Sequence, residues 1–295
     1  MYIDQFIQYL SSEKRYSSHT VSAYQNDLEQ FFNFLESNYE VLSASEINHQ
    51  MIRAWIMELI DNKISGRSVN RKLSSLKTFF RYLRKNNLVT VNPMLKILPP
   101  KTNKALPEFV SNEQMNLLLD DVNFEEDFEG KRDRLIIEMF YFTGIRLAEL
   151  VGLTNADVDL EKKQIKVLGK RNKERIIPFG NILERSIVAY ISEREKMTGT
   201  VRAEQAFFTT KKGLKIYKKL VYRVVNSYLS KVSTLKKKSP HILRHTFATH
   251  MLNNGADLNA IKELLGHANL SATQVYTHNT IDKLKSIYNQ AHPRA

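Results

Sequence analysis

The sequence predicts a mainly α-helical protein of two domains: an N-terminal helical bundle, then a mixed α/β domain with a small antiparallel sheet. Three observations lead to this fold class. Glycine and proline are scarce, with 10 and 7 residues in a chain of 295, against a usual combined share of roughly 12%. Apolar residues recur at helical spacing along most of the chain. A proline-rich stretch near residue 100 breaks that pattern and suggests a boundary between domains.

The N-terminal domain, residues 1–100, is expected to hold four helices. Each is indicated by apolar residues three or four positions apart. Ser17 and Ser18 precede the second helix, and Ser45 is expected to cap the third. Residues 101–110 are basic, include Pro107 and lack a helical period, so they are predicted to be a linker. The second domain, 111–295, is expected to begin with a helix capped by Ser111, which Glu113 and Gln114 follow.

The fourth helix, SGRSVNRKLSSLKTFFRYLRKNN, has an unusual charge pattern. Between Lys63 and Lys85 it carries eight lysines and arginines and no acidic residue. A solvated face normally mixes signs, because like charges one turn apart repel. A face of one sign that also carries small polar groups suits contacts to phosphates and base edges, although a plain solvated face is the alternative. The predicted DNA-binding residues are Arg67, Asn70, Arg71, Ser74, Lys77, Thr78 and Arg81.

The second domain combines helices with a hairpin. DRLIIEMFYFTGIRLAELVGL reads as core helix, interrupted at Thr143 and Gly144. KKQIKVLGKRNKERIIPFG alternates apolar and polar residues on both sides of a basic tip, which predicts a β-hairpin. QAFFTT, residues 205–210, is a possible third strand, and helices resume after it. The C-terminal segment, IDKLKSIYNQAHPRA, has an apolar stripe that suits packing on its own domain or on a neighbouring subunit.

Charge and composition narrow the function. The net charge is +13, which favours a polyanionic partner such as nucleic acid. The chain has no cysteine, which excludes disulfides, cysteine-containing zinc fingers and thiol nucleophiles. It has neither an apolar run of membrane-spanning length nor the pattern of a signal peptide, so we expect a cytoplasmic, nucleoid-associated protein without a membrane partner.

Six polar residues suggest a site for phosphoryl transfer without a metal or other cofactor. They are Arg146, Lys170, His241, Arg244, His267 and Tyr276. Two arginines can bind both non-bridging oxygens of one phosphate and stabilise the charge that develops at phosphorus. A tyrosine can act as the nucleophile and a lysine as the acid for the leaving oxygen. His241 and His245 also have the spacing of a zinc helix, but Arg244 between them argues against a metal.

Four ordered segments, TGIRLAEL, GKRNKERIIP, HILRHTFATHML and LLGHANLSATQVYTH, resemble the signature boxes of the tyrosine recombinases, the phage integrase family. The likeness is greatest to the Xer site-specific recombinases and extends over nearly the whole chain. One departure is Ser271-Ala272, where the family commonly has paired threonines. The resemblance implies that this chain cuts and rejoins DNA strands through a 3′-phosphotyrosyl intermediate and a Holliday junction.

The resemblance also assigns roles to residues. Arg146 and Arg244 would bind the scissile phosphate, and His267 would add a third hydrogen bond. His241 would be a general base or a further phosphate ligand. Lys170 would protonate the departing 5′ oxygen, and Tyr276 would attack phosphorus. Glu149 and His245 would support these groups, whereas His250 and His278 match the boxes without an assigned role.

The implied partners are double-stranded DNA and other recombinase subunits. Four subunits, identical or paired with a paralogue, would assemble on two sites, with a septal DNA translocase as a candidate activator. The implied process is resolution of chromosome dimers at cell division. Integration of a mobile element, type IB topoisomerase-like nicking and rejoining, DNA binding without catalysis and metal-dependent hydrolysis remain as alternatives. The first residues are not expected to include an extra arm-binding domain.

Overall fold

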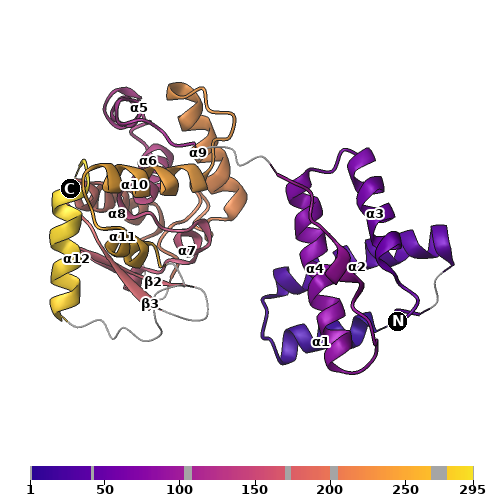
Figure 1. The fold of residues 1–295 in the computed structure, drawn as a ribbon. Helices are drawn as coiled ribbons and strands as arrows, with labels where there is room; N and C mark the ends of the chain where they lie inside the picture. The colour runs from indigo at the N-terminus through magenta and orange to yellow at the C-terminus, as the bar shows by residue number, and fades with distance from the viewer. Residues whose placement is uncertain are drawn as a thin grey trace. The chain divides into compact units, whose positions relative to one another are not determined.

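The computed structural model describes residues 2–40, 43–102, 108–169, 174–199, 205–266 and 278–294. The chain divides into two compact units, Met1–Ala105 and Leu106–Ala295 (Figure 1), and each has its own apolar core. In these ranges, none of the helices has the length and apolar character that crossing a membrane requires.

The N-terminal unit is a helical bundle. Its elements are α1 (Ile3–Ser12), α2 (Ser18–Tyr39), α3 (His49–Asp61), α4 (Gly66–Lys85) and the short 3₁₀ helix η1 (Pro93–Lys96). The core combines aliphatic and large aromatic side chains; within it Phe31 packs against Trp55 and Phe79 against Phe6. These large apolar surfaces stabilise the bundle by leaving water, which compensates for the ordering of the chain.

The start of α3 differs from the prediction. Asn48, and not Ser45, caps this helix: its side-chain oxygen accepts hydrogen bonds from the backbone N–H groups of Gln50 and Met51. The hydroxyl of Ser45 instead bonds that of Ser43 in the preceding turn. Both residue types are good caps, and asparagine is here the one that stands next to the first helical residue.

The second unit combines helices with a three-stranded sheet. Its elements are α5 (Asn112–Asn116), the π-helical turn η2 (Leu117–Asp121), α6 (Phe128–Thr143), α7 (Leu147–Gly152), the 3₁₀ turn η3 (Asn155–Asp157), β1 (Val158–Asp159), β2 (Gln164–Leu168), β3 (Glu174–Pro178), α8 (Asn181–Thr198), α9 (Lys218–Val232), α10 (Pro240–Asn253), α11 (Leu258–Leu265) and α12 (His278–Ala291). The order in the sheet is β1-β2-β3, and both pairs are antiparallel.

Several expectations for this unit are confirmed. Ser111 caps the start of α5 as expected, and the structure shows Gln114 as its partner in a capping box. The hairpin is present, with Ile165 opposite Ile177. The expected strand at 205–210 is wrong: these residues make only isolated bridges, Thr154 with Ala206 and Thr209 with Lys215. The apolar residues that suggested a strand, Phe207 and Phe208, are buried in a loop; β1 supplies the third strand instead.

The predicted break at Thr143 and Gly144 is a sharp corner between α6 and α7. Gly144 has φ of 58°, a left-handed conformation that favours glycine. A Cβ atom at this position would lie 2.6 Å from Phe247 Cδ1 and 2.7 Å from Leu265 Cδ2. Both backbone conformation and space therefore require glycine here, and the corner brings the start of α7 close to α10 and α11.

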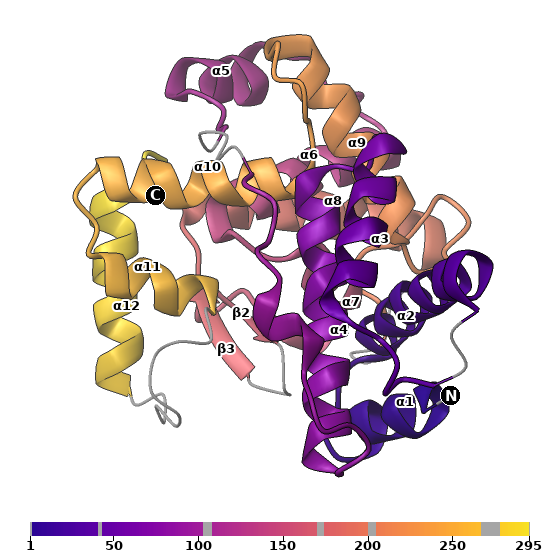
Figure 2. The ribbon, with the colours of Figure 1, turned by 45° about the vertical axis from the view of Figure 1, so that its right-hand side comes forward.

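The C-terminal helix packs on its own unit. α12 contacts α10, α11 and β3 (Figure 2), and Leu284, Tyr288 and Ala291 on it are buried. His292 follows and is also buried: its Nε2 lies 3.2 Å from the carbonyl oxygen of Tyr141, and its Nδ1 accepts the backbone N–H of Arg294 at 3.1 Å. One ring nitrogen must donate and the other accept, so the neutral imidazole fits this position.

We predict that Gly144→Ala destabilises the second unit by about 3 kcal/mol, the combined cost of a left-handed alanine and of overpacking. Gly255 provides a control for backbone strain alone, because it has φ of 85° and open space around its Cα; Gly255→Ala should cost about 1 kcal/mol. Gly152→Ala, with neither constraint, should be neutral. Urea unfolding of the three variants tests this order, and equal effects at Gly144 and Gly255 would contradict the steric argument.

We also predict a pH dependence from His292. Burial lowers the pKa of its imidazole from 6.5 to about 4, so the unfolded chain binds more protons between these pH values. The resulting stabilisation is present above pH 6.5 and is lost as the pH falls toward 4. Between pH 7 and 5 the loss should be about 2 kcal/mol. His292→Phe, which packs without titrating, should show a correspondingly shallower decline in urea unfolding; an unchanged slope would count against the buried neutral histidine.

Candidate active site

Arg146 stands at the start of α7, directly after the Gly144 corner. Its backbone N–H donates to Glu149 Oε2 at 2.8 Å, and its Nη1 donates to Oε1 of the same carboxylate at 2.7 Å. The Nη2 atom bonds the carbonyl oxygen of Gly266 at 2.8 Å. The side chain of Arg146 is 27% exposed, so part of its guanidinium group faces solvent while the rest is held by the protein.

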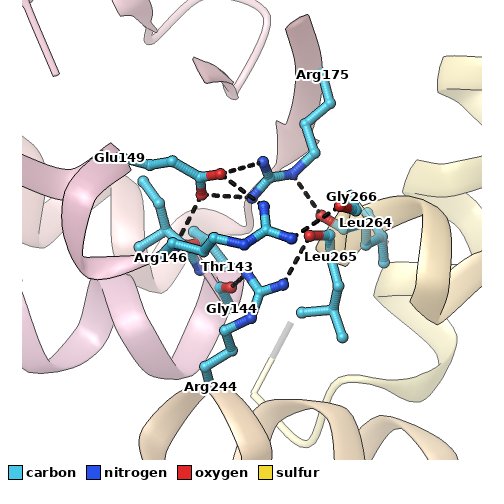
Figure 3. A network of polar contacts seen from close by, with 10 residues as sticks. Thr143, Gly144, Arg146, Glu149, Arg175, Arg244, Leu264, Leu265 and Gly266 are labelled. Carbon is cyan, nitrogen blue, oxygen red and sulfur yellow. Dashed lines mark hydrogen bonds and ion pairs between the residues drawn. The ribbon is translucent and has the colours of Figure 1, made fainter. Parts of the chain in front are cut away.

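Arg244 approaches the same place from α10. Its Nη2 donates to the carbonyl oxygen of Leu265 at 2.7 Å, and its Nη1 donates to that of Gly144. The residue is buried. The two arginines predicted to bind one phosphate thus belong to different helices, but their guanidinium groups are anchored to adjacent carbonyl groups (Figure 3).

A third arginine, Arg175 on β3, completes the network. Its Nη1 and Nη2 each donate to one oxygen of Glu149 at 2.8 Å, and its Nε donates to the carbonyl oxygen of Leu264 at 2.8 Å. Arg175, Arg244 and Arg146 therefore bond the carbonyls of three consecutive residues, 264 to 266, at the end of α11 (Figure 3). The carboxyl end of a helix is its negative pole, which favours cations there.

Sequence reasoning did not identify Arg175, although a signal for it exists. Residues of a strand alternate between its two faces, so Arg175 shares a face with Ile177. Its cross-strand partner is Val167, which is buried. A charged residue at an inward position of an apolar hairpin needs a buried partner, and here that partner is Glu149.

The charges of the network are incompletely balanced. Burial alone would raise the pKa of Glu149, but hydrogen bonds and charge from Arg175, and then from Arg146, lower it to about 2. Burial, with repulsion from Arg146 and Arg175, lowers the pKa of Arg244 to about 9. Arg244 is still cationic at pH 7, so the three guanidinium groups share one carboxylate. An anion bound here would relieve the remaining repulsion.

The histidines of α10 differ in exposure. His241 is exposed, in the first turn of the helix and one turn before Arg244; His245 is partly buried. His250 is buried, and its Nδ1 lies 3.1 Å from the hydroxyl of Tyr141, which is a structural contact within the core. Over the part of the chain that the structure describes, no three histidine or acidic side chains gather in a group able to hold a metal ion.

The other three predicted catalytic residues, Lys170, His267 and Tyr276, lie outside the described residues. The sequence places Lys170 between β2 and β3 and His267 directly after Gly266. The segments that carry them are thus connected to the network: Arg175 lies on β3, and Arg146 bonds the carbonyl of Gly266.

The predicted DNA-binding residues lie along α4. Arg67, Arg71, Ser74, Lys77 and Arg81 are exposed, and Asn70 and Thr78 are partly buried. Some of them also make contacts within the unit. Asn70 donates to the carbonyl oxygen of Pro100 at 3.0 Å, and the hydroxyls of Ser74 and Thr78 bond carbonyls one turn earlier in α4.

A buried carboxylate on α2 organises this face of α4. Asp27 is 1% exposed and accepts hydrogen bonds from Arg71, Lys72 and Ser75. Sequence reasoning did not single out Asp27, because nothing near it in the chain distinguishes it from a solvated acid. The side chain of Arg71 remains 52% exposed, so the pairing holds its guanidinium group in place without removing it from the surface.

The comparisons with known proteins agree with this fold. Residues 3–87 match the model of the N-terminal SAM-like domain of phage integrases, and residues 108–283 match that of the phage integrase family. Tyrosine recombinase XerC of Chlorobaculum tepidum is 38% identical, over all of this chain and 95% of the relative. XerC of Listeria innocua is 40% identical, over 98% of this chain and 97% of the relative. The chain belongs to the phage integrase family and is a tyrosine site-specific recombinase.

Solved structures confirm the fold class. The integrase of transposon Tn1549, in complex with circular intermediate DNA, superimposes with a TM-score of 0.70 at 19% identity, covering 95% of this chain and 98% of that one. XerH site-specific recombinase bound to its palindromic difH substrate gives 0.70 at 23%, covering 90% and 78%. At these identities the likeness concerns the fold alone. The predicted family and the two-part, mainly α-helical architecture are confirmed.

We predict that Glu149→Gln destabilises the catalytic unit by on the order of 3 kcal/mol at pH 7, because Glu149 ionises far more readily in the folded state. A lowered carboxyl pKa stabilises the fold above the unfolded value of 4.5, and that contribution is lost as the pH falls toward 2. The gap between wild type and variant should therefore narrow from pH 5 to pH 3 in urea unfolding. Glu126→Gln is the control, since Glu126 is 92% exposed beside Lys131; a gap independent of pH would contradict the assignment.

Proposed function

We propose that the chain cleaves and rejoins duplex DNA with Tyr276 as the nucleophile and Arg146 and Arg244 as the ligands of the scissile phosphate. The observation that carries this proposal is the convergence of these two arginines, from α7 and α10, on neighbouring carbonyls beside one shared carboxylate. Two guanidinium groups held with a fixed separation suit a phosphodiester, whose two non-bridging oxygens accept forked hydrogen bonds.

The unbalanced charge of the network supports the same role. The depressed pKa of Arg244 reflects burial and the two neighbouring arginines, and a phosphate anion would offset both. Because the guanidinium groups are already held by protein groups, little reorganisation would be needed as negative charge grows at phosphorus. The network would thus stabilise the transition state more than the ground state.

The remaining residues complete a balanced reaction in the proposal. The Tyr276 hydroxyl loses its proton to a base as its oxygen attacks phosphorus, the bond to the 5′ oxygen breaks, and Lys170 supplies the proton that this oxygen takes up. His241 acts as the general base or binds phosphate together with His267. The 3′-phosphotyrosine keeps the energy of the phosphodiester, so the 5′ hydroxyl of a partner strand can reverse the step without ATP or another cofactor.

The N-terminal domain, proposed as residues 1–100, would supply sequence-independent affinity through α4. Its exposed cations, Arg67, Lys77 and Arg81 among them, lie on one helix, and Arg71 is fixed by the buried Asp27. Contacts of this type position a protein on the phosphate backbone. The hydroxyl and amide groups of Ser74, Thr78 and Asn70 would add contacts to bases or phosphates. The linker would be residues 101–110, followed by the catalytic domain, 111–295.

The proposed process is exchange between two copies of a chromosomal site, which resolves chromosome dimers before cell division. The names of the full-length relatives, XerC at 38–40% identity, favour this over integration of a mobile element. Four subunits, identical or shared with a paralogue, would act through a Holliday junction in the cytoplasm, with a septal DNA translocase as a candidate activator. A type IB topoisomerase-like activity is the alternative, in which one subunit would nick and rejoin DNA alone.

The test is covalent trapping on a nicked duplex that carries a candidate chromosomal resolution site. Wild type should form a protein–DNA adduct that survives denaturing gel electrophoresis and is insensitive to chelator. Tyr276→Phe should form none, because it lacks the attacking oxygen, while still shifting the duplex in a native gel. Tyr222→Phe, at an exposed tyrosine of the same unit, is the matched control and should retain the adduct.

Other outcomes would separate the alternatives. An adduct with Tyr276→Phe would exclude this tyrosine as the nucleophile. A shifted duplex without adduct in wild type would favour a DNA-binding protein without cleavage. Equal cleavage of a duplex with a shuffled site, together with relaxation of any supercoiled plasmid, would favour the topoisomerase-like activity over site-specific recombination.

A further inference from the structure

Arg175 is placed to organise the site without contacting substrate. It is buried, with its side chain 4% exposed, so a DNA phosphate has little access to it. All three nitrogens of its guanidinium group donate to protein oxygens: two to Glu149 and one to the carbonyl of Leu264. A cation with this burial and these partners acts on other residues of the protein.

The first of those residues is Glu149. The fork from Arg175 reaches both carboxylate oxygens, so it fixes the plane of the carboxylate as well as its position. In that orientation Oε1 accepts from Arg146 Nη1 and Oε2 from the backbone N–H of Arg146. The orientation of Arg146 therefore depends on Arg175 through Glu149.

The second partner is the end of α11. The bond from Arg175 Nε to Leu264 lies next to those from Arg244 to Leu265 and from Arg146 to Gly266. Gly266 is also packed closely on Arg175: a Cβ atom there would lie 3.0 Å from Arg175 Cδ and 3.2 Å from its Nη1. The path of the chain as it leaves α11, one residue before His267, is thus shaped around the side chain of Arg175.

We propose that Arg175 is a positioning residue for DNA strand cleavage, which aligns Arg146 through Glu149 and holds the carboxyl end of α11 against β3. This inference rests on the proposed function. Arg175 connects three segments that carry predicted catalytic residues: the hairpin with Lys170, the start of α7 with Arg146, and the end of α11 that leads to His267. Lysine cannot replace it, because an ammonium group keeps the charge but lacks the planar fork.

The test compares Arg175→Lys with wild type in single-turnover cleavage of the nicked duplex. We expect the rate of adduct formation to fall at least ~10-fold, while the dissociation constant for the duplex changes by less than ~3-fold. The matched control is Arg194→Lys. Arg194 is a buried arginine of the same unit that bonds Asn155 and the carbonyl of Phe207, outside the network. Its replacement should therefore leave the rate of adduct formation within ~3-fold of wild type. Both variants are assayed below their melting temperatures.

A substrate with a methylphosphonate at the scissile position separates alignment of Arg146 from a general loss of structure. This group replaces a charged oxygen by methyl, so correctly placed arginines contribute less to its cleavage. The defect of Arg175→Lys should therefore shrink to about 3-fold or less, because alignment of Arg146 matters less there. A purely structural defect would slow cleavage of both substrates equally, and that result would overturn the proposal.

The remaining outcomes are also decisive. If wild type forms the adduct and Arg175→Lys forms it equally fast, only the inference on Arg175 is wrong. If wild type forms no adduct, the proposed function fails and the inference with it. If the buried lysine charge prevents folding, Arg175→Met is the second variant, because methionine fills similar space without a charge. Adduct formation at the wild-type rate in this folded variant would likewise exclude a positioning role.

Discussion

The carboxylate of Glu149 is the interaction on which the geometry of the catalytic unit depends. Three guanidinium groups meet at one end of α11, and unshielded cations in such a place would repel one another and lose their hydration. Glu149 accepts hydrogen bonds from two of the three and lowers the potential at the third. The cost of burying these charges is offset by bonds with good geometry, which is the condition for a stable buried ion pair.

Backbone carbonyls supply the rest of the compensation. The last carbonyls of a helix lack partners within it, and at the end of α11 they accept from Arg175, Arg244 and Arg146 in order along the chain. The corner at Gly144 contributes one more carbonyl, to Arg244. The carbonyl groups of a helix end and of a chain reversal, which would otherwise lack partners, thus hold the arginines of a cationic site. This site can still bind an anion.

The sequence predicted the parts of this site that depend on local pattern. The interruption at Thr143 and Gly144 is visible as a glycine in an apolar helix. Arg146 is conspicuous as a charge among apolar neighbours, and Arg244 as an arginine among closely spaced histidines. The hairpin follows from its alternating apolar and polar residues, and the family resemblance predicts that the two arginines belong to one site. Apart from the family resemblance, each of these signals lies within roughly 20 residues of chain, close to the range over which periodicity is informative.

The sequence did not reveal what depends on packing between distant segments. In the sequence, Arg175 cannot be told from the other cations of a basic hairpin; its role is visible only when α7 and α11 pack against it. Asp27 likewise cannot be told from a surface acid, because only the packing of α4 buries it. Phe207 and Phe208 read as a strand because burial in a loop and burial in a sheet leave the same apolar pattern. Asn48 and Ser45 are both acceptable caps, and only the position at which α3 begins chooses between them.

The short length of α11 has a mechanical consequence. A helix of eight residues is too short to be stable alone in water, so side chains at its two ends hold it: Asp257 caps its start, and the three arginines bind its end. Each residue that unwound from that end would lengthen the chain leading to Tyr276 by about 2 Å, the difference between helical and extended rise per residue. The same contacts that hold the arginines therefore also fix the point from which the chain leading to Tyr276 starts.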